Sequence, residues 1–232
     1  MKQSITSLVA AAWLLAPPVA AQDNPVVVEL FTSQGCSSCP AADEMLAEIA
    51  TREDIIALAL HVDYWDYIGW QDTFGDPVHS DRQRAYAAKG QRRSVFTPEM
   101  IVQGQSDIVG AKPMALMKAV AHHADQPAKV SLELARNGND LTIKAHRLTA
   151  LPGPLTLHLL RYTPLQTTQI MRGENAGRAI EYANIVEGWT VLGEWDGKTA
   201  LSMQAEVQGP KPVVVLVQAR GTGPILAAAR VK

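Results

Sequence analysis

Cysteine is scarce in this chain, because its 232 residues contain only Cys36 and Cys39. An excess of one charge is also lacking, since 21 basic and 23 acidic residues leave a formal net charge of −2. This balance excludes the basic surface with which proteins hold nucleic acid or anionic membranes. After residue 21 no apolar run approaches the roughly 18 residues of a membrane-spanning helix. Gly-x-Ser-x-Gly turns and phosphate-binding loops are missing too, which removes the main signatures of hydrolases and nucleotide-binding enzymes.

Metal ligands are equally sparse. A structural zinc site takes four ligands, and this chain has one CxxC without a second CxxC or an HxxxH pair. We therefore predict no zinc site and no bound cofactor. Cu(I) stays an alternative, because a soft ion can be held by the two thiolates with Met100 nearby.

Residues 1–21 are typical of a secretory signal. Lys2 supplies a positive start, Ile5–Ala16 is apolar, and Val19-Ala20-Ala21 offers small residues for cleavage. A retained membrane anchor is the alternative, but the apolar stretch is short for one. We expect a periplasmic or secreted protein with no stable membrane anchor. Its compartment would be oxidising, so the two cysteines can form a disulfide.

Residues 22–126 alternate between strand and helix patterns. Val26–Thr32 and Ile55–Val62 are continuous apolar runs, typical of strands buried on both faces. Between them, apolar residues at helical spacing predict a helix over Ser38–Arg52. Ser80 has the spacing of a capping residue and predicts the start of a second helix.

The same alternation continues to the end of this segment. Val95–Val102 is a predicted strand with a proline near its start, and Asp107–Ala111 is its return strand. Pro113 opens a helix that is expected to reach about Ala124. The order β-α-β-α-β-β-α predicts an α/β domain, which ends where the composition changes at Asp125-Gln126-Pro127.

Residues 127–232 show strand patterns separated by turn signals, without a strong helical period. A hairpin is predicted across Asn137-Gly138-Asn139. The predicted strands are Val130–Arg136, Leu141–Leu148, Leu155–Tyr162, Leu201–Val207, Val213–Ala219 and Ile225–Val231. We interpret this half as a mostly antiparallel β-sandwich domain.

The cysteine pair follows a predicted strand and opens a predicted helix, which is a specific context for redox chemistry. Unpaired N–H groups and the dipole of a helix N-terminus favour a thiolate, the nucleophilic form of Cys36. Cys39 then lies within reach to resolve a mixed disulfide. A structural staple is the alternative, but so short a loop restrains the unfolded chain by only about 2 kcal/mol. We predict that Cys36 is open to an incoming protein.

The order strand, CxxC, helix, strand, helix, X-Pro strand, hairpin, helix resembles the thioredoxin superfamily. A closer resemblance, over nearly the whole mature chain, is to a family of exported bacterial thioredoxin-like proteins of unknown function. It is carried by the strings ELFTSQGCSSCPAAD, ALHVDYWDYIGW, TPEMIVQG and RGENAGR. The superfamily resemblance implies a cis-proline beside the dithiol and a substrate-binding backbone just before it. Thr97 and Pro98 hold that place. Ser37-Ser38 replace the Gly-Pro of thioredoxin itself, which leaves oxidant and reductant both open.

Two carboxylates follow the second predicted strand. Asp63 and Asp66 are expected at the same sheet edge as Cys36, and either is a candidate proton shuttle for Cys39. A loop carboxylate that caps backbone N–H groups is the alternative. His61, on the strand, is predicted to be a buried core histidine. The same region holds an aromatic cluster that either binds a peptide or packs between the domains: Tyr64, Trp65, Tyr67, Trp70 and Phe74.

The segment 172–178 is polar and glycine-rich and predicts a long loop. We hypothesise that it lies over the dithiol and restricts access to it. Arg172 and Arg178 could then stabilise a thiolate or an acidic ligand, with Glu174 and Asn175 between them. A plain surface loop is the alternative.

The sequence favours an exported thiol–disulfide oxidoreductase that acts on protein cysteines. Cys36 would attack and Cys39 resolve, and both a protein substrate and a redox-recycling partner are required. The alternatives are a Cu(I)-binding module and a non-catalytic interaction protein on the same scaffold.

Overall fold

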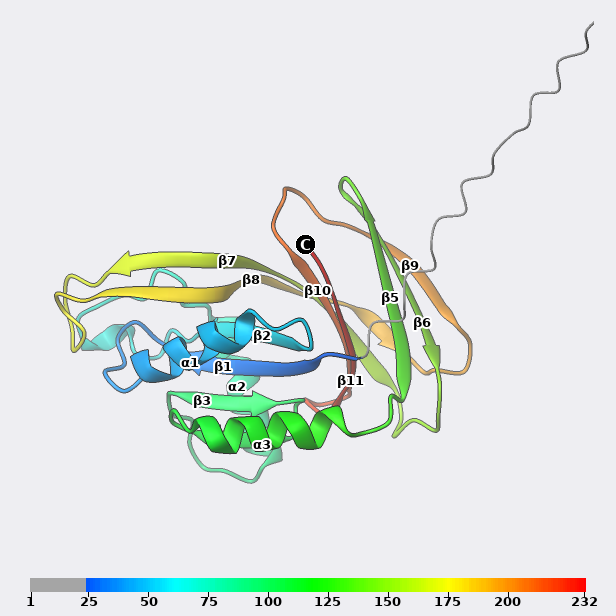
Figure 1. Ribbon diagram of the computed structural model, residues 1–232, viewed down its shortest axis with the longest axis horizontal. Helices are drawn as coiled ribbons and strands as arrows, with labels where there is room; N and C mark the ends of the chain where they lie inside the picture. The colour runs from blue at the N-terminus through cyan, green and yellow to red at the C-terminus, as the bar shows by residue number, and fades with distance from the viewer. Residues whose placement is uncertain (1–23) are drawn as a thin grey trace, which may run out of the picture.

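The computed structural model describes residues 24–232, so the predicted signal over residues 1–21 lies outside the described part. Within residues 24–232, the fold consists of an eight-stranded mixed sheet, a three-stranded antiparallel sheet and three α-helices (Figure 1). The prediction of a mixed α/β fold with a second, antiparallel sheet is confirmed at this level. Within residues 24–232, every helix is too short or too polar to cross a bilayer.

The elements are distributed over the two sheets as follows. The eight-stranded sheet contains, in spatial order, β11 (Ile225–Val231), β10 (Val213–Ala219), β7 (Leu155–Gln169), β8 (Ala179–Trp195), β2 (Ile55–His61), β1 (Val26–Thr32), β3 (Glu99–Val102) and β4 (Ser106–Val109). The three-stranded sheet contains β5 (Val130–Asn137), β6 (Asp140–Arg147) and β9 (Leu201–Glu206). The helical segments are α1 (Pro40–Ala50), the short 3-10 turn η1 (Asp66–Ile68), α2 (Pro77–Lys89) and α3 (Pro113–Ala124).

The central strand β1 is buried on both faces, as its continuous apolar run predicts. Val28 and Leu30 pack toward α1 and α3, whereas Val27 and Phe31 pack toward Tyr86 of α2. Figure 1 shows α1 and α3 on the near side of the sheet and α2 behind it. Because successive residues of a strand alternate between faces, Thr32 at its end points toward α1.

One sheet crosses the boundary that was predicted near residue 126. Strand β8 pairs in parallel with β2 through Ile185 and Ala59, so segments from both sides of that boundary share the large sheet. The three-stranded sheet packs on β7 and β10, for example through Ile143 and Val215. The predicted sandwich is therefore present, but one of its layers is the extension of the large sheet.

Several element boundaries differ from the sequence predictions. Helix α2 begins at Pro77, where the Asp76 side chain accepts a hydrogen bond from the Val78 amide N–H (2.9 Å), so the predicted start at Ser80 is wrong. An aspartate before a helix-opening proline is the stronger start signal. The predicted strand Val95–Val102 shortens to β3, because a proline preceding it cannot donate to the ladder.

Candidate functional site

The dithiol lies in the turn between β1 and α1. Cys36 and Cys39 form a disulfide, with their Cα atoms 5.4 Å apart. The amide N–H of Cys36 donates to the carbonyl oxygen of Ser33 (3.1 Å), which closes the turn. Helix α1 begins at Pro40, two residues later than the predicted Ser38. Cys39, rather than Cys36, therefore occupies the N-cap position.

Both cysteine side chains are covered. Cys36 is 3% exposed and Cys39 is 1% exposed, whereas the intervening Ser37 and Ser38 face solvent. The prediction that Cys36 is open to an incoming protein is wrong for this conformation. A loop from the second half of the chain is hydrogen-bonded to the backbone of this turn.

That loop joins β7 to β8 and spans residues 170–178. The Asn175 side-chain amide donates to the carbonyl oxygens of Gln34 and Cys36, both at 2.9 Å. The Glu174 carboxylate accepts from the Ser37 amide N–H (3.3 Å). Figure 1 shows the long β7–β8 hairpin reaching the end of the sheet at which the β1–α1 turn lies. The structure thus brings Glu174 and Asn175 to the dithiol turn.

The two arginines of the loop, Arg172 and Arg178, differ in their contacts. Arg178 donates to the side-chain oxygen of Asn175 (3.1 Å) and so orients its amide toward the turn, while Arg172 is exposed. Gly173 has φ of 78°, and a Cβ at this position would lie 3.2 Å from the Cβ of Trp70. The loop therefore needs glycine here to pack closely against residue 70.

Thr97 and Pro98 lie at the same end of the sheet as the dithiol. The Thr97–Pro98 peptide bond is cis. Phe31 of β1 pairs with Glu99 of β3 in antiparallel register. This register places Pro98, the residue before β3, next to the C-terminal end of β1. Trp65 links the two segments, because its indole N–H donates to the Thr97 hydroxyl (2.7 Å) and its Cβ packs beside Gly35.

The predicted aromatic cluster surrounds this end of the sheet without forming one patch. Trp70 donates to the side-chain oxygen of Gln34 (2.8 Å), and the Phe74 ring lies edge-on to that of His61. Tyr67 is 81% exposed and stacks on Trp65. Trp65 and Trp70 therefore support the turn, and Tyr67 is the ring offered to solvent.

Asp63 and Asp66 are engaged within their own segment. The Asp63 carboxylate accepts from the Ser80 hydroxyl, and the Asp66 carboxylate accepts from the Asp72 amide N–H (3.0 Å). Burial raises the pKa of Asp66. These bonds hold the segment between β2 and α2 in place.

A different carboxylate lies one helical turn after Cys39. Asp43, on the first turn of α1, is 3% exposed and accepts from the Thr32 hydroxyl (2.8 Å). Burial raises its pKa to about 7, against a partial opposing effect of the charge on His61. The sequence carries a signal for it, since a residue four positions after Cys39 and three before Leu46 falls on the buried face of the helix.

His61 is fully buried, as predicted, but it is not a satisfied core histidine. Its Nδ1 bonds to the carboxylate of Asp72 (2.8 Å), while Nε2 has no partner among residues 24–232. Burial opposes ionisation of Asp72, but the charge of His61 and the amide N–H of Gln34 (2.7 Å) hold its pKa below the usual value. Tyr182 of β8 lies against His61, with ring centroids 4.8 Å apart.

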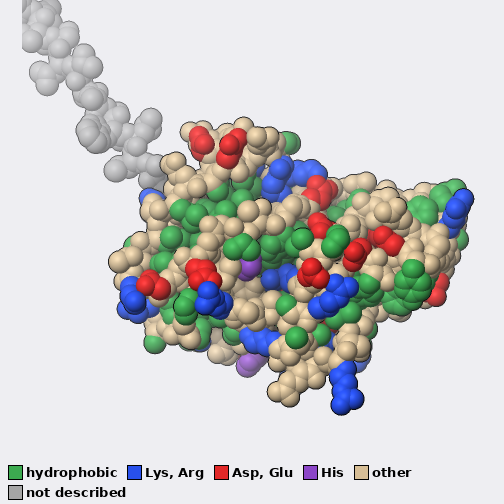
Figure 2. Space-filling model, turned by 180° about the vertical axis from the view of Figure 1, so that it is seen from behind, with side chains coloured by type: hydrophobic (Ala, Val, Ile, Leu, Met, Phe, Trp, Pro, Cys, Tyr) green, Lys and Arg blue, Asp and Glu red, His purple; other side chains and the backbone are tan. Residues whose placement is uncertain are grey.

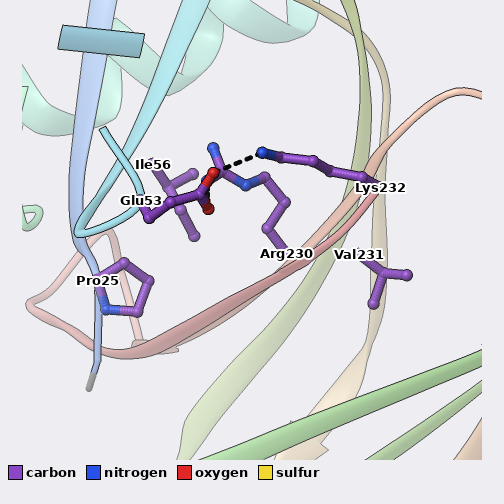
Figure 3. Close-up of a pocket in the computed structure, with 6 residues that line it drawn as sticks. All are labelled: Pro25, Glu53, Ile56, Arg230, Val231 and Lys232. Carbon is purple, nitrogen blue, oxygen red and sulfur yellow. Dashed lines mark hydrogen bonds and ion pairs between the residues drawn. The ribbon is translucent and has the colours of Figure 1, made fainter. Parts of the chain in front are cut away.

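A cavity of about 320 Å³ lies at the opposite end of β1 and β2 from the dithiol (Figure 3). The carboxylate that lines it, Glu53, is paired with Lys232 (2.7 Å) and Arg230 (2.9 Å).

Within residues 24–232, no group of three or more His, Cys, Asp or Glu side chains could hold a metal ion. Met100 is fully buried in the core between the sheet and α1. On the face in Figure 2, acidic and basic side chains are interspersed rather than gathered by sign.

Comparison with protein families matches residues 27–218 to a family described as protein of unknown function (DUF1223). The chain belongs to this DUF1223 family. A similar solved structure is the X-ray crystal structure of an Agrobacterium tumefaciens protein determined as a structural-genomics target. It is 28% identical, with a TM-score of 0.77, and the match covers 91% of this chain and 96% of that one. A search of curated proteins returns no match.

Proposed function

We propose that this DUF1223 protein is an exported thiol–disulfide oxidoreductase with a thioredoxin-like N-terminal region. The observation that carries the proposal is the Cys36–Cys39 disulfide at the start of α1, with the cis Thr97–Pro98 peptide at the same end of the sheet. A disulfide that closes so short a loop stabilises a fold by only about 2 kcal/mol, which is a weak reason for a purely structural bond. Redox chemistry accounts for its position better.

The reaction would proceed through a mixed disulfide. A partner thiolate attacks the Cys36 sulfur, the Cys36–Cys39 bond breaks, and Cys39 leaves as a thiolate. A second partner thiolate then attacks the partner sulfur of the mixed disulfide, and Cys36 leaves as a thiolate. The partner gains a disulfide and the protein becomes a dithiol. The reverse sequence reduces a partner disulfide. Thr97 and Pro98 would position the partner chain beside Cys36. The cycle requires a protein substrate and a second partner that restores the starting redox state, in the periplasm or outside the cell.

Access to Cys36 would be controlled by the 170–178 loop. Asn175 and Glu174 hold the loop on the dithiol turn, and Arg178 orients Asn175. Cys36 is 3% exposed, and the loop is bonded to the backbone of its turn, so in this proposal the partner reaches the sulfur after the loop moves away. The loop therefore acts as a lid in this proposal, rather than as a source of positive charge from Arg172.

The oxidoreductase proposal predicts that Cys39→Ala traps partners. Without the resolving thiol, a mixed disulfide on Cys36 cannot be released internally. Expressed in its natural host, this variant should accumulate adducts that migrate as larger species on non-reducing gels and disappear with dithiothreitol. Mass spectrometry of those species would identify the partner proteins.

The matched control is the Cys36→Ala/Cys39→Ala variant, which should form no adducts. In parallel, equilibration of the wild type with glutathione should give a reduction potential above about −300 mV, the region of structural disulfides. No adducts together with a potential below that value would refute the proposal. Tight Cu(I) binding that requires both cysteines, without thiol exchange, would instead favour the metal-binding alternative.

The lid predicts that Asn175→Ala speeds reduction of the disulfide. The substitution removes two hydrogen bonds to the turn, each worth about 1 kcal/mol. If loop opening precedes attack, the rate of reduction by dithiothreitol should rise about 10–30-fold. Quenched-flow alkylation followed by mass spectrometry measures that rate.

Gln169→Ala, an exposed position at the end of β7, serves as the control for Asn175→Ala and should leave the rate unchanged. Equal reduction rates for the wild type and Asn175→Ala would show that the loop does not limit access. That outcome would not contradict the proposed thiol–disulfide exchange at Cys36 and Cys39.

A further inference from the structure

A second pocket, of about 400 Å³, lies where the chain after β9 meets strands β7 and β8. One cation, Arg161, lines it together with apolar Leu159 and Val207 and polar Thr190 and Gln208. From residue 161 to the loop on the dithiol turn, strand β7 extends for about 30 Å. The pocket is therefore separate from the site around Cys36.

Arg161 is a half-buried cation whose obvious acidic partners are engaged elsewhere. Its Nε is buried and, among residues 24–232, has no hydrogen-bond partner. The acid opposite it in the sheet, Glu187, pairs with Lys211 instead. The other acid of the lining, Glu206, accepts from the side-chain amide of Gln208 (3.2 Å). Buried polar atoms without a partner are rare in folded proteins, so this one calls for an explanation.

A second arginine beside the pocket shows what a structural guanidinium does here. Arg136 of β5 donates to three backbone carbonyl oxygens of the chain after β9: those of Val207 (3.4 Å), Gly209 and Lys211 (3.0 Å). Arg161 reaches the same segment, because its Nη2 lies 3.5 Å from the place of a Cβ on Gly209. The wall of the pocket is thus held by Arg136, and the guanidinium of Arg161 is left for a ligand.

The pairing of β7 with β8 is interrupted at the same place. Leu160 pairs with Trp189 and Arg161 pairs with Glu187, so Gly188 is the extra residue of a β-bulge. Gly188 has φ of 71°, in the left-handed region that favours glycine. Bulges redirect side chains and are over-represented next to active sites. The bulge and the unpartnered arginine therefore mark one position on the sheet.

We propose that this pocket binds an organic carboxylate, which Arg161 holds as a charge-assisted, bidentate pair. The planar fork of a guanidinium matches the two oxygens of a carboxylate. Leu159 and Val207 offer apolar surface to the hydrocarbon part, and Thr190 and Gln208 offer hydrogen bonds to further polar groups. The two acids of the lining disfavour a multiply charged anion such as phosphate, because like charges repel.

The volume limits the size of the ligand. About 400 Å³ has room for about a dozen water-sized groups of about 30 Å³ each. A small free acid fits, and so does the C-terminal residue of a peptide, which presents the same carboxylate. This site does not depend on the oxidoreductase function proposed above.

NMR titration of the ¹⁵N-labelled wild type with N-acetyl-leucine tests the proposal. We expect the Arg161 Nε–H resonance and the backbone amides of Gly188 and Gln208 to shift along one saturating curve. N-acetyl-leucinamide keeps the size and the apolar group without the charge, and it should bind at least about tenfold more weakly. A heptapeptide with a free C-terminal leucine separates the two sources: clearly tighter binding than N-acetyl-leucine assigns the site to a peptide C-terminus, and equal or weaker binding to a free acid.

Variants distinguish a ligand-binding arginine from a structural one. Arg161→Met should lower the affinity for N-acetyl-leucine about 10–100-fold, as loss of hydrogen bonds to a charged group predicts. Its thermal unfolding midpoint without ligand should equal or exceed that of the wild type, because the unpartnered donor is gone. Arg220→Met is the matched control, since Arg220 is exposed and paired with Glu194, and it should bind as the wild type does.

Three results would each overturn the inference. They are unshifted resonances with both carboxylates, equal affinity for N-acetyl-leucinamide or inorganic phosphate, and wild-type affinity in Arg161→Met. If Arg161→Met fails to fold, the comparison of acid and amide at Gly188 and Gln208 of the wild type decides alone. The thiol-exchange measurements on Cys36 and Cys39 are unaffected by any of these results.

Discussion

Replacing Arg82 by Met is expected to lower the free energy of unfolding by about 3–5 kcal/mol, because it leaves a buried carboxylate without its cation. Glu29, in the middle of β1, is fully buried, and Arg82 of α2 donates to it at 2.5 Å. Tyr86 donates to the second carboxylate oxygen at 2.6 Å. The guanidinium also lies 4.2 Å from the ring centroid of Trp189 in β8 and bonds to Gln218 in β10 (3.1 Å). Urea unfolding at pH 7 measures the loss.

Arg84→Met is the matched control for this prediction. Arg84 lies on the same helix and also has an acidic partner, Asp81, but both side chains are exposed. Exposed pairs contribute little, so this variant should change the free energy of unfolding by less than about 0.5 kcal/mol. The double variant Glu29→Gln/Arg82→Met removes the unpaired charge and should recover part of the loss. A loss below about 1 kcal/mol in Arg82→Met would show that the charge is solvated or neutralised in another way.

Replacing Asp43 by Asn is expected to stabilise the protein, increasingly so as the pH rises. The pKa of this buried carboxyl is raised from 3.8 to about 7, so the folded state favours the protonated acid. Below about pH 4 both folded and unfolded states carry the proton, and burial of the acid has no ionisation cost. As the pH rises to about 7 the unfolded state ionises first, and the fold loses up to about 4 kcal/mol. Above pH 7 the loss is constant.

Asn has the shape of Asp and can still accept from Thr32, but it does not ionise. The variant should therefore gain about 1–2 kcal/mol over the wild type at pH 5 and up to about 4 kcal/mol at pH 8. Urea unfolding at the two pH values gives both differences. Glu44→Gln, an exposed carboxylate beside it, should show no such trend. An equal effect of Asp43→Asn at both pH values would mean that the carboxyl ionises normally in the fold.

Local sequence patterns account for much of the fold. The apolar run of β1, the helical spacing of α1 and the proline that opens α3 all give the elements seen in the structure. The turn at Asn137-Gly138-Asn139 joins β5 to β6 as expected. Each of these signals is complete within one element and its neighbouring turn, so no distant contact is needed to interpret it.

Strand β8 shows where such patterns fail. Its 17 residues include Glu181, Asn184, Glu187 and Gly188, and two register shifts interrupt its pairing with β7. Polar and glycine residues with bulges break the alternation that marks a strand. Asn184 has φ of 48° and donates to the carbonyl oxygen of Ala57 (2.9 Å), which anchors β8 beside β2. The strand is held by a neighbour that lies far away in the sequence.

In the candidate site, too, some features can be predicted from the sequence and others cannot. The cysteine pair, its turn between strand and helix, and the threonine–proline segment are all legible in the order of residues, because each depends on a short stretch of chain. The position of Asp43 on the buried face of α1 also follows from helical spacing. The contacts of the 170–178 loop with the dithiol turn do not, because they arise from side chains that meet across the fold. Asn175 is 139 positions from Cys36, and no local periodicity specifies that contact. Contacts between residues far apart in the sequence therefore decide how this dithiol turn is covered, and only the tertiary structure shows them.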